Sequence, residues 1–268
     1  MASCPEGMCD GSGFLFDEAA RRARPCRCRP GRIARKRAAA LEARIPQRYR
    51  EVSFEREPLP SIERANPHLV REVRRYARDV ASELDAGRGM WFTGDVGTGK
   101  TTVAMLISKA AMAADRTVAI YSLPRLLALL RDTYNEDARY SLNDLVERLC
   151  AVDLLHVDDV GSEQSTPWVL EQLYTIVNTR YEDGRAMLLT TNLITREGDD
   201  DLRAQIGDRT VSRLWEMCGE PMHMYGDDQR RVTYRLPDSA APAAAPAWDD
   251  EPLPYGEPRR GPARWAAS

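Results

Sequence analysis

The sequence predicts an α/β fold in which helices cover both faces of a parallel sheet. Short apolar segments alternate with helical segments between residues 90 and 236, which is the order expected of β-α-β units. A glycine-rich phosphate-binding motif joins the first of these strands to the first helix. Two adjacent carboxylates end a later apolar strand, where a nucleoside triphosphatase needs them.

The phosphate-binding pattern G-x-x-x-x-G-K-[ST] is matched by Gly94, Asp95, Val96, Gly97, Thr98, Gly99, Lys100 and Thr101, with Thr102 next in the chain. Residues 90–93 predict a buried strand before this P-loop, and residues 102–114 predict a helix after it. The glycines allow the backbone N–H groups to surround phosphate oxygens. We expect Lys100 to reach the β- and γ-phosphates of ATP and Thr101 to bind Mg²⁺. The alternative, a glycine-rich turn with a chance lysine, leaves the flanking strand and helix unexplained.

Composition limits the classes of protein that the chain can belong to. A net charge of −3 over 268 residues does not by itself indicate a nucleic-acid partner. The sequence contains no apolar run of about 18 residues, so we expect no membrane span. The first residues lack the charged and apolar regions of a signal peptide. We therefore expect a cytoplasmic, reducing location, where six cysteines do not form a disulfide framework.

Residues 1–30 are predicted to form a small cysteine-rich module. Its cysteines are Cys4, Cys9, Cys26 and Cys28, surrounded by glycine and proline. Four thiolates complete a tetrahedral Zn²⁺ site, and thirty residues cannot build a core without such a constraint. The spacing is C-x4-C and C-x-C rather than two C-x2-C pairs, so unligated thiols remain the alternative. Cys150 and Cys218 lie in predicted helices and are expected in the core.

Residues 31–89 are predicted to form a basic helical connector. From Arg21 to Arg50 the chain carries twelve Arg or Lys residues against one acid, Glu42. This run predicts a helix at 32–43 that is either a solvated face or a docking surface for nucleic acid or a partner, and we favour docking. Prolines then predict an extended stretch, and residues 69–84 predict one amphipathic helix before the P-loop strand.

Residues 90–236 are predicted to form the nucleotide-binding domain. Further strands are expected at 117–121, 152–159 and 186–192, and helices at 123–134, 142–150, 167–183 and 207–218. Asp158 and Asp159 end the second of these strands and match the Walker B element. The first acid is expected to hold Mg²⁺ and the second to polarise the attacking water. Two acids that merely close a strand are the alternative.

Three further side chains are candidates for the catalytic site. Asn192 ends the strand that follows the two acids, where it either senses the γ-phosphate and holds water or simply ends the strand. Arg209 and Arg213 lie one helical turn apart on one face. These arginines are either surface ion-pair residues or arginine fingers that reach the γ-phosphate of a neighbouring subunit.

The chain resembles the AAA+ ATPases of the bacterial helicase-loader family, DnaC and DnaI, and their relative IstB, the transposition ATPase. The resemblance runs from about residue 4 to residue 236. It is carried by the segments 25–31, 45–54, 94–102, 154–161, 190–193 and 207–218. The first cysteine pair, C-x4-C, departs from the family's usual C-x2-C.

This resemblance implies a five-stranded AAA+ core, ATP hydrolysis to ADP and phosphate, and self-assembly of AAA+ domains. It also implies an N-terminal module that binds a hexameric replicative helicase of the DnaB type. Single-stranded DNA is expected at the segment 122–140, where Arg125, Arg131 and Tyr134 offer cations and a stacking ring. Arg213 corresponds to the family's arginine finger and Arg209 to a helper, whereas Arg230 and Arg231 match a further basic position only loosely.

The resemblance leaves two functions open, and two others fit less well. A helicase loader is favoured by the cysteine-rich start, and a transposition ATPase of the IstB type is the alternative. A small-molecule kinase is not expected to carry paired acids and a sensor asparagine. A sequence-reading initiator requires a DNA-binding module after residue 236, where residues 237–268 predict a disordered Pro/Ala-rich tail with Trp248 and Trp265 as possible anchors.

Overall fold

A computed structural model of the chain describes Cys4 and residues 6–17, 22–29, 45–135, 137–193, 195–196 and 199–229. The chain divides into two units, Met1–Thr233 and Tyr234–Ser268. The predicted helix at 32–43, Arg230, Arg231 and the tail with Trp248 and Trp265 lie outside the described residues. Within the described part, no helix is both long and apolar enough to cross a membrane.

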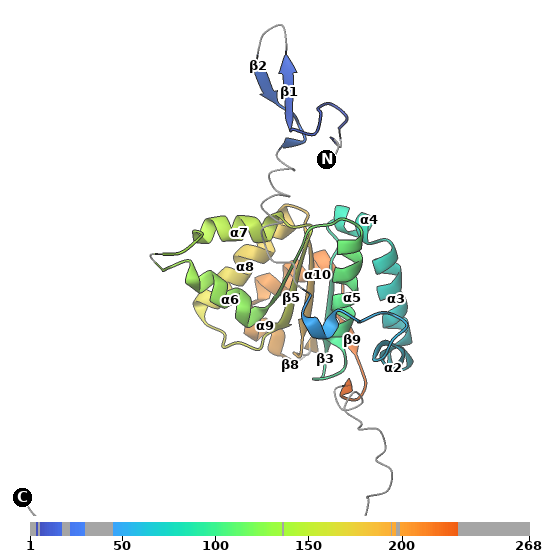
Figure 1. Cartoon of the computed structure of the whole chain (residues 1–268). Coiled ribbons are helices and arrows are strands. Elements are labelled where there is room, and N and C mark those ends of the chain that lie inside the picture. Colours follow the sequence, from blue (N-terminus) through green and yellow to red (C-terminus); the bar gives the residue numbers. More distant parts are fainter. Residues whose placement is uncertain are drawn as a thin grey trace, which may run out of the picture. The chain divides into compact units, whose positions relative to one another are not determined.

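A five-stranded parallel sheet forms the centre of the nucleotide-binding domain, as the resemblance implied (Figure 1). Its strands are β3 (Met90–Gly94), β4 (Val118–Ser122), β5 (Leu154–Val160), β6 (Ala186–Thr191) and β9 (Met222–Met224), in the order β4-β5-β6-β3-β9. Every neighbouring pair in this sheet is parallel. The predicted four strands lie within one or two residues of these bounds, and β9 was not predicted because three residues carry too short a pattern.

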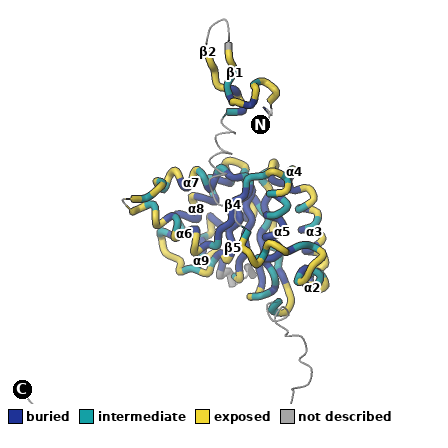
Figure 2. Tube along the Cα trace, viewed as in Figure 1, coloured by how far each residue is buried: buried dark blue, intermediate teal, exposed yellow. Residues whose placement is uncertain are grey.

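Two hydrophobic cores lie on the two faces of the sheet. One face is covered by α2 (Leu59–Ala65), α3 (Pro67–Arg78), α4 (Val80–Asp85) and α5 (Lys100–Ala113). The other face is covered by α6 (Leu123–Asp132), α7 (Leu142–Ala151), α8 (Pro167–Glu182), α9 (Asp201–Ile206) and α10 (Asp208–Cys218). In β4, Ile120 faces the first core and Tyr121 the second, as the alternation of strand side chains requires. Figure 2 shows the buried strands between two layers of helices whose outer surfaces are exposed.

The chain before β3 differs from its predicted structure. The stretch predicted to be extended contains a 3-10 turn, η1 (Gln47–Tyr49), and the helix α2. The predicted helix 69–84 is two helices, α3 and α4, which meet at Asp79. Pro60 is the second residue of α2 and Pro67 the first residue of α3. The N–H groups of a first helical turn have no partner within the helix, so these prolines lie at helix starts instead of breaking helices.

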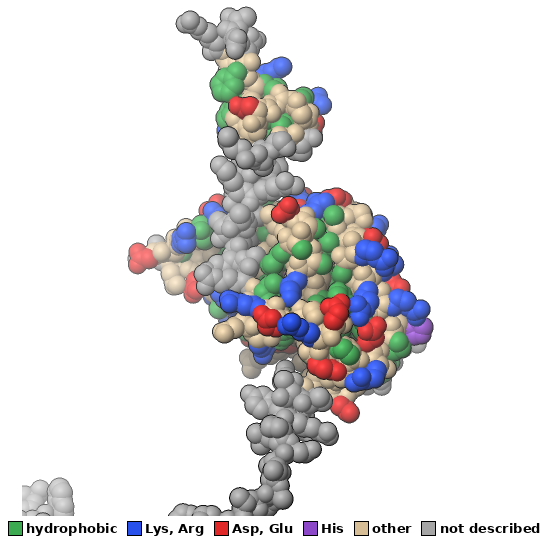
Figure 3. Space-filling model, turned by 45° about the vertical axis from the view of Figure 1, so that its right-hand side comes forward, with side chains coloured by type: hydrophobic (Ala, Val, Ile, Leu, Met, Phe, Trp, Pro, Cys, Tyr) green, Lys and Arg blue, Asp and Glu red, His purple; other side chains and the backbone are tan. Residues whose placement is uncertain are grey.

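Opposite charges alternate on the surface of these helices. Arg74 lies 2.9 Å from Glu63, and Arg75 lies 3.0 Å from Glu72. Figure 3 shows basic and acidic side chains interspersed over the face that is turned forward there. The described part of the connector therefore carries a mixed surface rather than a single-sign patch on this face.

The cysteine-rich module contains an antiparallel hairpin of β1 (Phe14–Asp17) and β2 (Arg22–Pro25). Phe14 pairs with Pro25, and the N–H of Cys26 donates to the carbonyl of Gly13 at 3.0 Å. A second small hairpin joins β7 (Thr195–Arg196) to β8 (Asp199–Asp200) after the central strand β6. The first hairpin holds the segment around Gly13 beside the C-x-C pair.

Candidate nucleotide-binding site

The P-loop connects β3 to α5, as predicted. Its glycines adopt positive φ, with values of 137° at Gly94, 86° at Gly97 and 101° at Gly99. Helix α5 begins at Lys100, and Gly99, its N-cap residue, makes no side-chain capping hydrogen bond. The N–H groups of the first turn of this 14-residue helix therefore have no side-chain cap, and the positive end of the helix dipole coincides with the glycine-rich loop.

Close packing also requires glycine at these positions. A Cβ at Gly94 would lie 2.3 Å from the carbonyl oxygen of Met224, and one at Gly99 would lie 2.4 Å from Cδ1 of Ile62. Strand β9 and helix α2 thus press against opposite ends of the loop. The loop is shaped from both sides by segments that the motif does not include.

Lys100 is held inside the loop. Its side chain is buried, and Nζ donates to the carbonyl of Gly94 at 2.8 Å and to that of Asp95 at 2.6 Å. The Thr98 hydroxyl also donates to the Asp95 carbonyl, at 2.9 Å. The ammonium group is therefore already placed beside the N–H groups that suit a phosphate.

The two Walker B acids lie at the end of β5, where its register against β6 shifts between Val157 and Val160. Asp158 is buried, and the Thr190 hydroxyl donates to its Oδ1 at 2.6 Å. The same hydroxyl accepts the N–H of Asp159 at 3.0 Å. Asp159 is exposed and has φ of 57°, a conformation that aspartate tolerates better than most residues. One threonine thus fixes the positions of both acids.

The donor set fits Mg²⁺. Thr101 offers a half-buried hydroxyl in the first turn of α5, and Asp158 offers a carboxylate whose Oδ1 is already oriented. Hydroxyl, carboxylate and water oxygens are the ligands that Mg²⁺ prefers. Because β3 and β5 are parallel strands of one sheet, their carboxyl ends meet at the same edge.

Tyr49 reaches this site from η1, and the sequence did not indicate it. Burial raises the pKa of Tyr49, the nearby Asp158 and Asp159 carboxylates add to the rise, and a hydrogen bond with the Thr101 side chain opposes it. Lys109 of α5 anchors the same segment by donating to the carbonyl of Val52 at 2.6 Å. The connector therefore contributes a phenol to the nucleotide site, which no local motif could predict.

The chain after β9 also returns to the P-loop. The N–H of Gln229 donates to the carbonyl of Gly97 at 2.9 Å. Oδ1 of Asp228 would lie 2.1 Å from a Cβ at Gly97. These two residues were missed as well, because the contact joins positions more than one hundred residues apart.

The other predicted catalytic residues lie at different places. Asn192 is exposed directly after β6, the strand beside the Walker B strand. Arg209 is exposed on α10. Arg213 lies on the same helix, with its guanidinium 4.1 Å from the centre of the Tyr181 ring and 3.4 Å from Glu216. Arg213 thus contacts its own helix and α8, which belong to the sheet face opposite α5.

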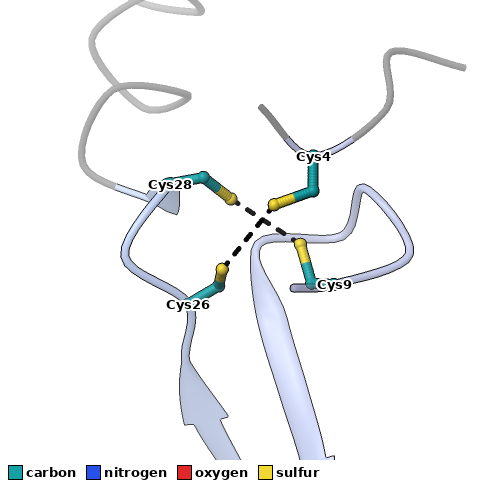
Figure 4. Close-up of side chains that lie close together, drawn as sticks. All are labelled: Cys4, Cys9, Cys26 and Cys28. Carbon is teal, nitrogen blue, oxygen red and sulfur yellow. Dashed lines mark hydrogen bonds between the residues drawn. The ribbon is translucent and has the colours of Figure 1, made fainter. Parts of the chain in front are cut away.

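The four predicted zinc ligands converge in the structure. The Sγ atoms of Cys4, Cys9, Cys26 and Cys28 all lie within 4.8 Å of one another (Figure 4). Cys4 and Cys26 are 3.9 Å apart, and Cys9 and Cys28 are 3.6 Å apart. A tetrahedron with Zn–S bonds of about 2.3 Å has edges of about 3.8 Å. The irregular sequence spacing therefore does not prevent the thiolates from fitting one Zn²⁺ ion.

The remaining cysteines behave as core residues. Cys150 is buried, as predicted, and burial raises the pKa of its thiol to about 11. Cys218 is half-buried, packs against the α6–α10 core, and lies 3.7 Å from the carbonyl of Met187. Burial raises the pKa of Cys218 to about 12, so both thiols stay protonated and unreactive at neutral pH.

The segment predicted to contact DNA forms an exposed aromatic surface. Tyr134 is 62% exposed, and its hydroxyl accepts the indole N–H of Trp168 at 3.2 Å. The Arg131 guanidinium lies 5.0 Å from the centre of the Trp168 ring. Arg125 is also exposed, on α6. Trp168 was not predicted, because it begins α8 and meets this segment only in the folded chain.

Comparisons with known proteins relate this chain to IstB-like ATP-binding proteins and to helicase loaders. The model of the family described as "IstB-like ATP binding protein" matches residues 74–220. The uncharacterized protein YdaV of Escherichia coli K12 is 27% identical over 155 residues, which cover 56% of this chain and 60% of YdaV. The replicative helicase loader DnaC of the same organism is 24% identical over 139 residues, which cover 52% of this chain and 55% of DnaC.

A crystal structure of the DnaC helicase loader has the same fold, with a TM-score of 0.56 and 21% sequence identity. The match covers 67% of this chain and 100% of that one. The chain spans between half and two thirds of the length of the curated relatives named above. The likeness to the solved structure supports the AAA+ fold of the core.

Proposed function

Because the chain belongs to the family of IstB-like ATP-binding proteins, we propose that it is an AAA+ ATPase that loads a replicative DNA helicase onto single-stranded DNA. The nucleotide part of this proposal rests on the groups that follow the carboxyl ends of β3 and β5 in one parallel sheet. These groups are the uncapped start of α5, the buried Lys100 ammonium, and the Asp158 carboxylate that accepts the Thr190 hydroxyl. This combination provides phosphate ligands and a cation ligand at the same place.

The proposed reaction converts ATP and water to ADP and phosphate. The loop N–H groups and Lys100 bind the phosphates, and Thr101 and Asp158 hold Mg²⁺, which neutralises charge on the β- and γ-phosphates when it is bound. Asp159 accepts a hydrogen bond from the attacking water, and Asn192 orients that water beside it. Asp159 is the one exposed residue of β5, so its carboxylate is accessible to water.

In the proposed reaction, a neighbouring subunit supplies the arginine that stabilises negative charge on the γ-phosphate. Arg213 rests on the Tyr181 ring and Glu216, on the sheet face opposite α5. A guanidinium in that position is available to the γ-phosphate bound by a neighbouring subunit rather than to its own, with Arg209 as a helper. We therefore propose that hydrolysis requires two or more chains.

The cysteine-rich module is the proposed helicase-binding element. Its four converging thiols suit a structural Zn²⁺ ion, and exposed Phe16 and Met8 offer apolar contact area. We divide the chain into this module (1–30), a basic connector (31–89), the ATPase domain (90–236) and a tail (237–268). A cytoplasmic setting is part of the proposal, because thiols that hold Zn²⁺ must stay reduced.

Single-stranded DNA is the proposed ligand of the exposed aromatic surface formed by Arg131, Tyr134 and Trp168, with Arg125 as a further exposed cation on α6. Rings that stack on bases and cations that contact phosphates are the combination that binds single strands without reading sequence. Tyr134 and Trp168 are linked by a hydrogen bond, and their ring centres lie 6.4 Å apart.

Transposition is the second candidate function, because the family model that matches is named for IstB. A transposition ATPase of this type remodels duplex DNA and recruits a transposase. The cysteine cluster favours the loader, since it offers a separate partner-binding module. Affinity for single-stranded and duplex DNA of equal length separates the two candidates, with a preference for single strands expected of a loader.

The test of the proposed function is co-purification of the full chain with the replicative helicase of its own host, with and without ATP. We expect a nucleotide-sensitive complex that the double variant Cys26→Ser/Cys28→Ser no longer forms, while its ATP binding persists. Cys150→Ser is the matched control, because that thiol lies in the ATPase core. Unchanged helicase binding by the double variant would exclude the module as the docking element.

A further inference from the structure

A buried histidine stands directly behind the Walker B acids. His156 is fully buried on β5 and precedes Asp158 by two residues. It lies on the same face of the strand as Leu154, which packs in the core beneath α5, so its side chain also faces α5. Its Nδ1 lies 3.0 Å from the hydroxyl of Ser108, which is also fully buried on α5. Its Nε2 is buried, makes no hydrogen bond, and lies 4.0 Å from Oδ1 of Asp158.

The neighbours of this ring fix its tautomer. A bare Nε2 would point a lone pair at the Asp158 carboxylate, whose Oδ1 is 4.0 Å away, and that arrangement is repulsive. The favoured tautomer therefore carries the proton on Nε2, while the Ser108 hydroxyl donates to Nδ1.

We propose that His156 is a positioning residue for the magnesium-binding carboxylate, with Ser108 holding its ring. Asp158 Oδ1 already accepts the Thr190 hydroxyl, and the Nε2–H of His156 approaches the same oxygen. A movement of about 1 Å brings Nε2 to the usual hydrogen-bond distance of about 2.9 Å. Both donors then hold Oδ1, which leaves Oδ2 for the metal and its water. This inference rests on the proposed ATPase function.

The arrangement also couples three elements that shape the site. Ser108 lies two turns along α5 from Lys100, His156 and Asp158 lie on β5, and Thr190 lies on β6. A chain of polar side chains therefore crosses the dry core from the P-loop helix to the strand before Asn192. Hydrogen bonds behind metal ligands orient those ligands and tune their affinity for the ion.

The test compares His156→Leu, His156→Gln and Ser108→Ala with the wild-type chain. The readouts are the Mg²⁺ concentration needed for half-maximal ATP hydrolysis, ATP affinity in excess chelator, and thermal unfolding. We expect His156→Leu to need about tenfold more Mg²⁺, with metal-free ATP affinity unchanged. His156→Gln restores a donor near the position of Nε2 and should return most of this loss. Ser108→Ala keeps the imidazole and should shift the Mg²⁺ requirement less, in the same direction.

Leu155→Ala is the matched control, because Leu155 lies next to His156 but faces the other core. It should lower the unfolding temperature without moving the Mg²⁺ requirement. A folded His156→Leu with the wild-type Mg²⁺ requirement overturns the inference. If His156→Leu does not fold, an unshifted Ser108→Ala overturns it instead. A wild-type chain that shows no Mg²⁺-dependent ATP binding or hydrolysis overturns both this inference and the proposed function.

Discussion

Thr190 contacts both Walker B acids from the neighbouring strand. It is fully buried, donates to Asp158 and accepts from the N–H of Asp159. Both acids therefore depend on one hydroxyl, because the register shift in β5 leaves the Asp159 N–H without a regular partner strand. The Walker B geometry is set from the neighbouring strand.

Thr190→Val should keep the shape of the side chain and remove the hydroxyl. Because the buried Asp158 carboxylate loses a donor and the partly buried Asp159 N–H loses its acceptor, we expect the free energy of unfolding to fall by about 1–3 kcal/mol. Hydrolysis should fall by about tenfold or more, since Asp158 is no longer oriented. Denaturant unfolding and steady-state ATPase rates check this, with Thr190→Ser, which keeps the hydroxyl, as the control. Equal ATPase rates in the Val and Ser variants would contradict the role of the Thr190 hydroxyl in orienting Asp158.

Gly99→Ala should damage the P-loop by strain and by collision. Its φ of 101° and a Cβ only 2.4 Å from Ile62 Cδ1 both oppose a side chain. We expect the free energy of unfolding to fall by about 1–3 kcal/mol and ATP binding to weaken.

The matched control for this variant is Gly184→Ala, where φ is 60° and a Cβ would meet nothing within 4 Å. It carries backbone strain alone, so it should be the milder of the two in a thermal melt. Adding Ile62→Ala to Gly99→Ala should recover part of the difference. Equal stabilities for the two alanine variants would mean that α2 does not press on the loop.

At the residue scale, the sequence predicted the groups that belong to motifs and missed those that reach the site from elsewhere. Lys100, Asp158 and the four clustered cysteines were predicted from local spacing. Tyr49 and Asp228 do not, because their contacts with the site depend on how distant segments pack. Local patterns contain no information about such contacts.

At the element scale, Arg180 joins the ends of three elements. This fully buried arginine on α8 donates to the carbonyls of Leu149, Cys150, Asp153 and Ala186 at distances between 2.6 and 3.3 Å. Burial lowers the pKa of Arg180 to about 10, so the side chain stays charged at neutral pH. It satisfies the last carbonyls of α7 and the starts of β5 and β6.

Arg180→Met should therefore destabilise the ATPase core by about 3–5 kcal/mol, because several buried carbonyls lose their donors together. Arg185→Met is the control. That side chain is 36% exposed, and its ion pair with Asp153 is worth less than about 1 kcal/mol at such a surface. Chemical denaturation of both variants measures the difference. A loss below about 1 kcal/mol for Arg180→Met would contradict the role of the buried arginine.

The elements were predicted well where they are long and regular. The strands β3 to β6 and the helices from α5 to α10 follow from periodic apolar patterns, except for the short α9 and β9. The region before β3 was predicted less well, because its prolines stand at helix starts and were interpreted as breaks. Asp79 divides one predicted helix in two without any residue that would signal an end.

At the scale of the whole molecule, the fold class follows from the order of elements, and the five-stranded parallel sheet confirms it. The positions of the cysteines also carried enough information to predict that they converge. A local sequence pattern contains no information about the surface of a partner molecule, so the proposed contacts with helicase, DNA and a neighbouring subunit do not follow from residue spacing.

Metal removal should unfold the cysteine-rich module and leave the ATPase core folded. We expect one Zn²⁺ per chain by atomic absorption, lost in Cys26→Ser or with a strong chelator, since a hairpin of this size needs the ion to stay folded. ATP binding by the core should survive that loss. Zinc content that is unchanged in Cys26→Ser, or absent from the wild-type chain, would contradict the assignment of the cluster.

The most direct test of the central claim is a calorimetric titration of the full chain with ATP and Mg²⁺, set beside the same titration of Lys100→Ala. Lys100→Ala removes two hydrogen bonds to loop carbonyls, so it should unfold at a somewhat lower temperature, and both titrations are run well below the unfolding temperature of the variant. We predict saturable heat from the wild-type chain and no detectable binding by the variant. Equal binding by the two chains, or no heat from the wild type, would contradict the claim that this loop holds a nucleoside triphosphate.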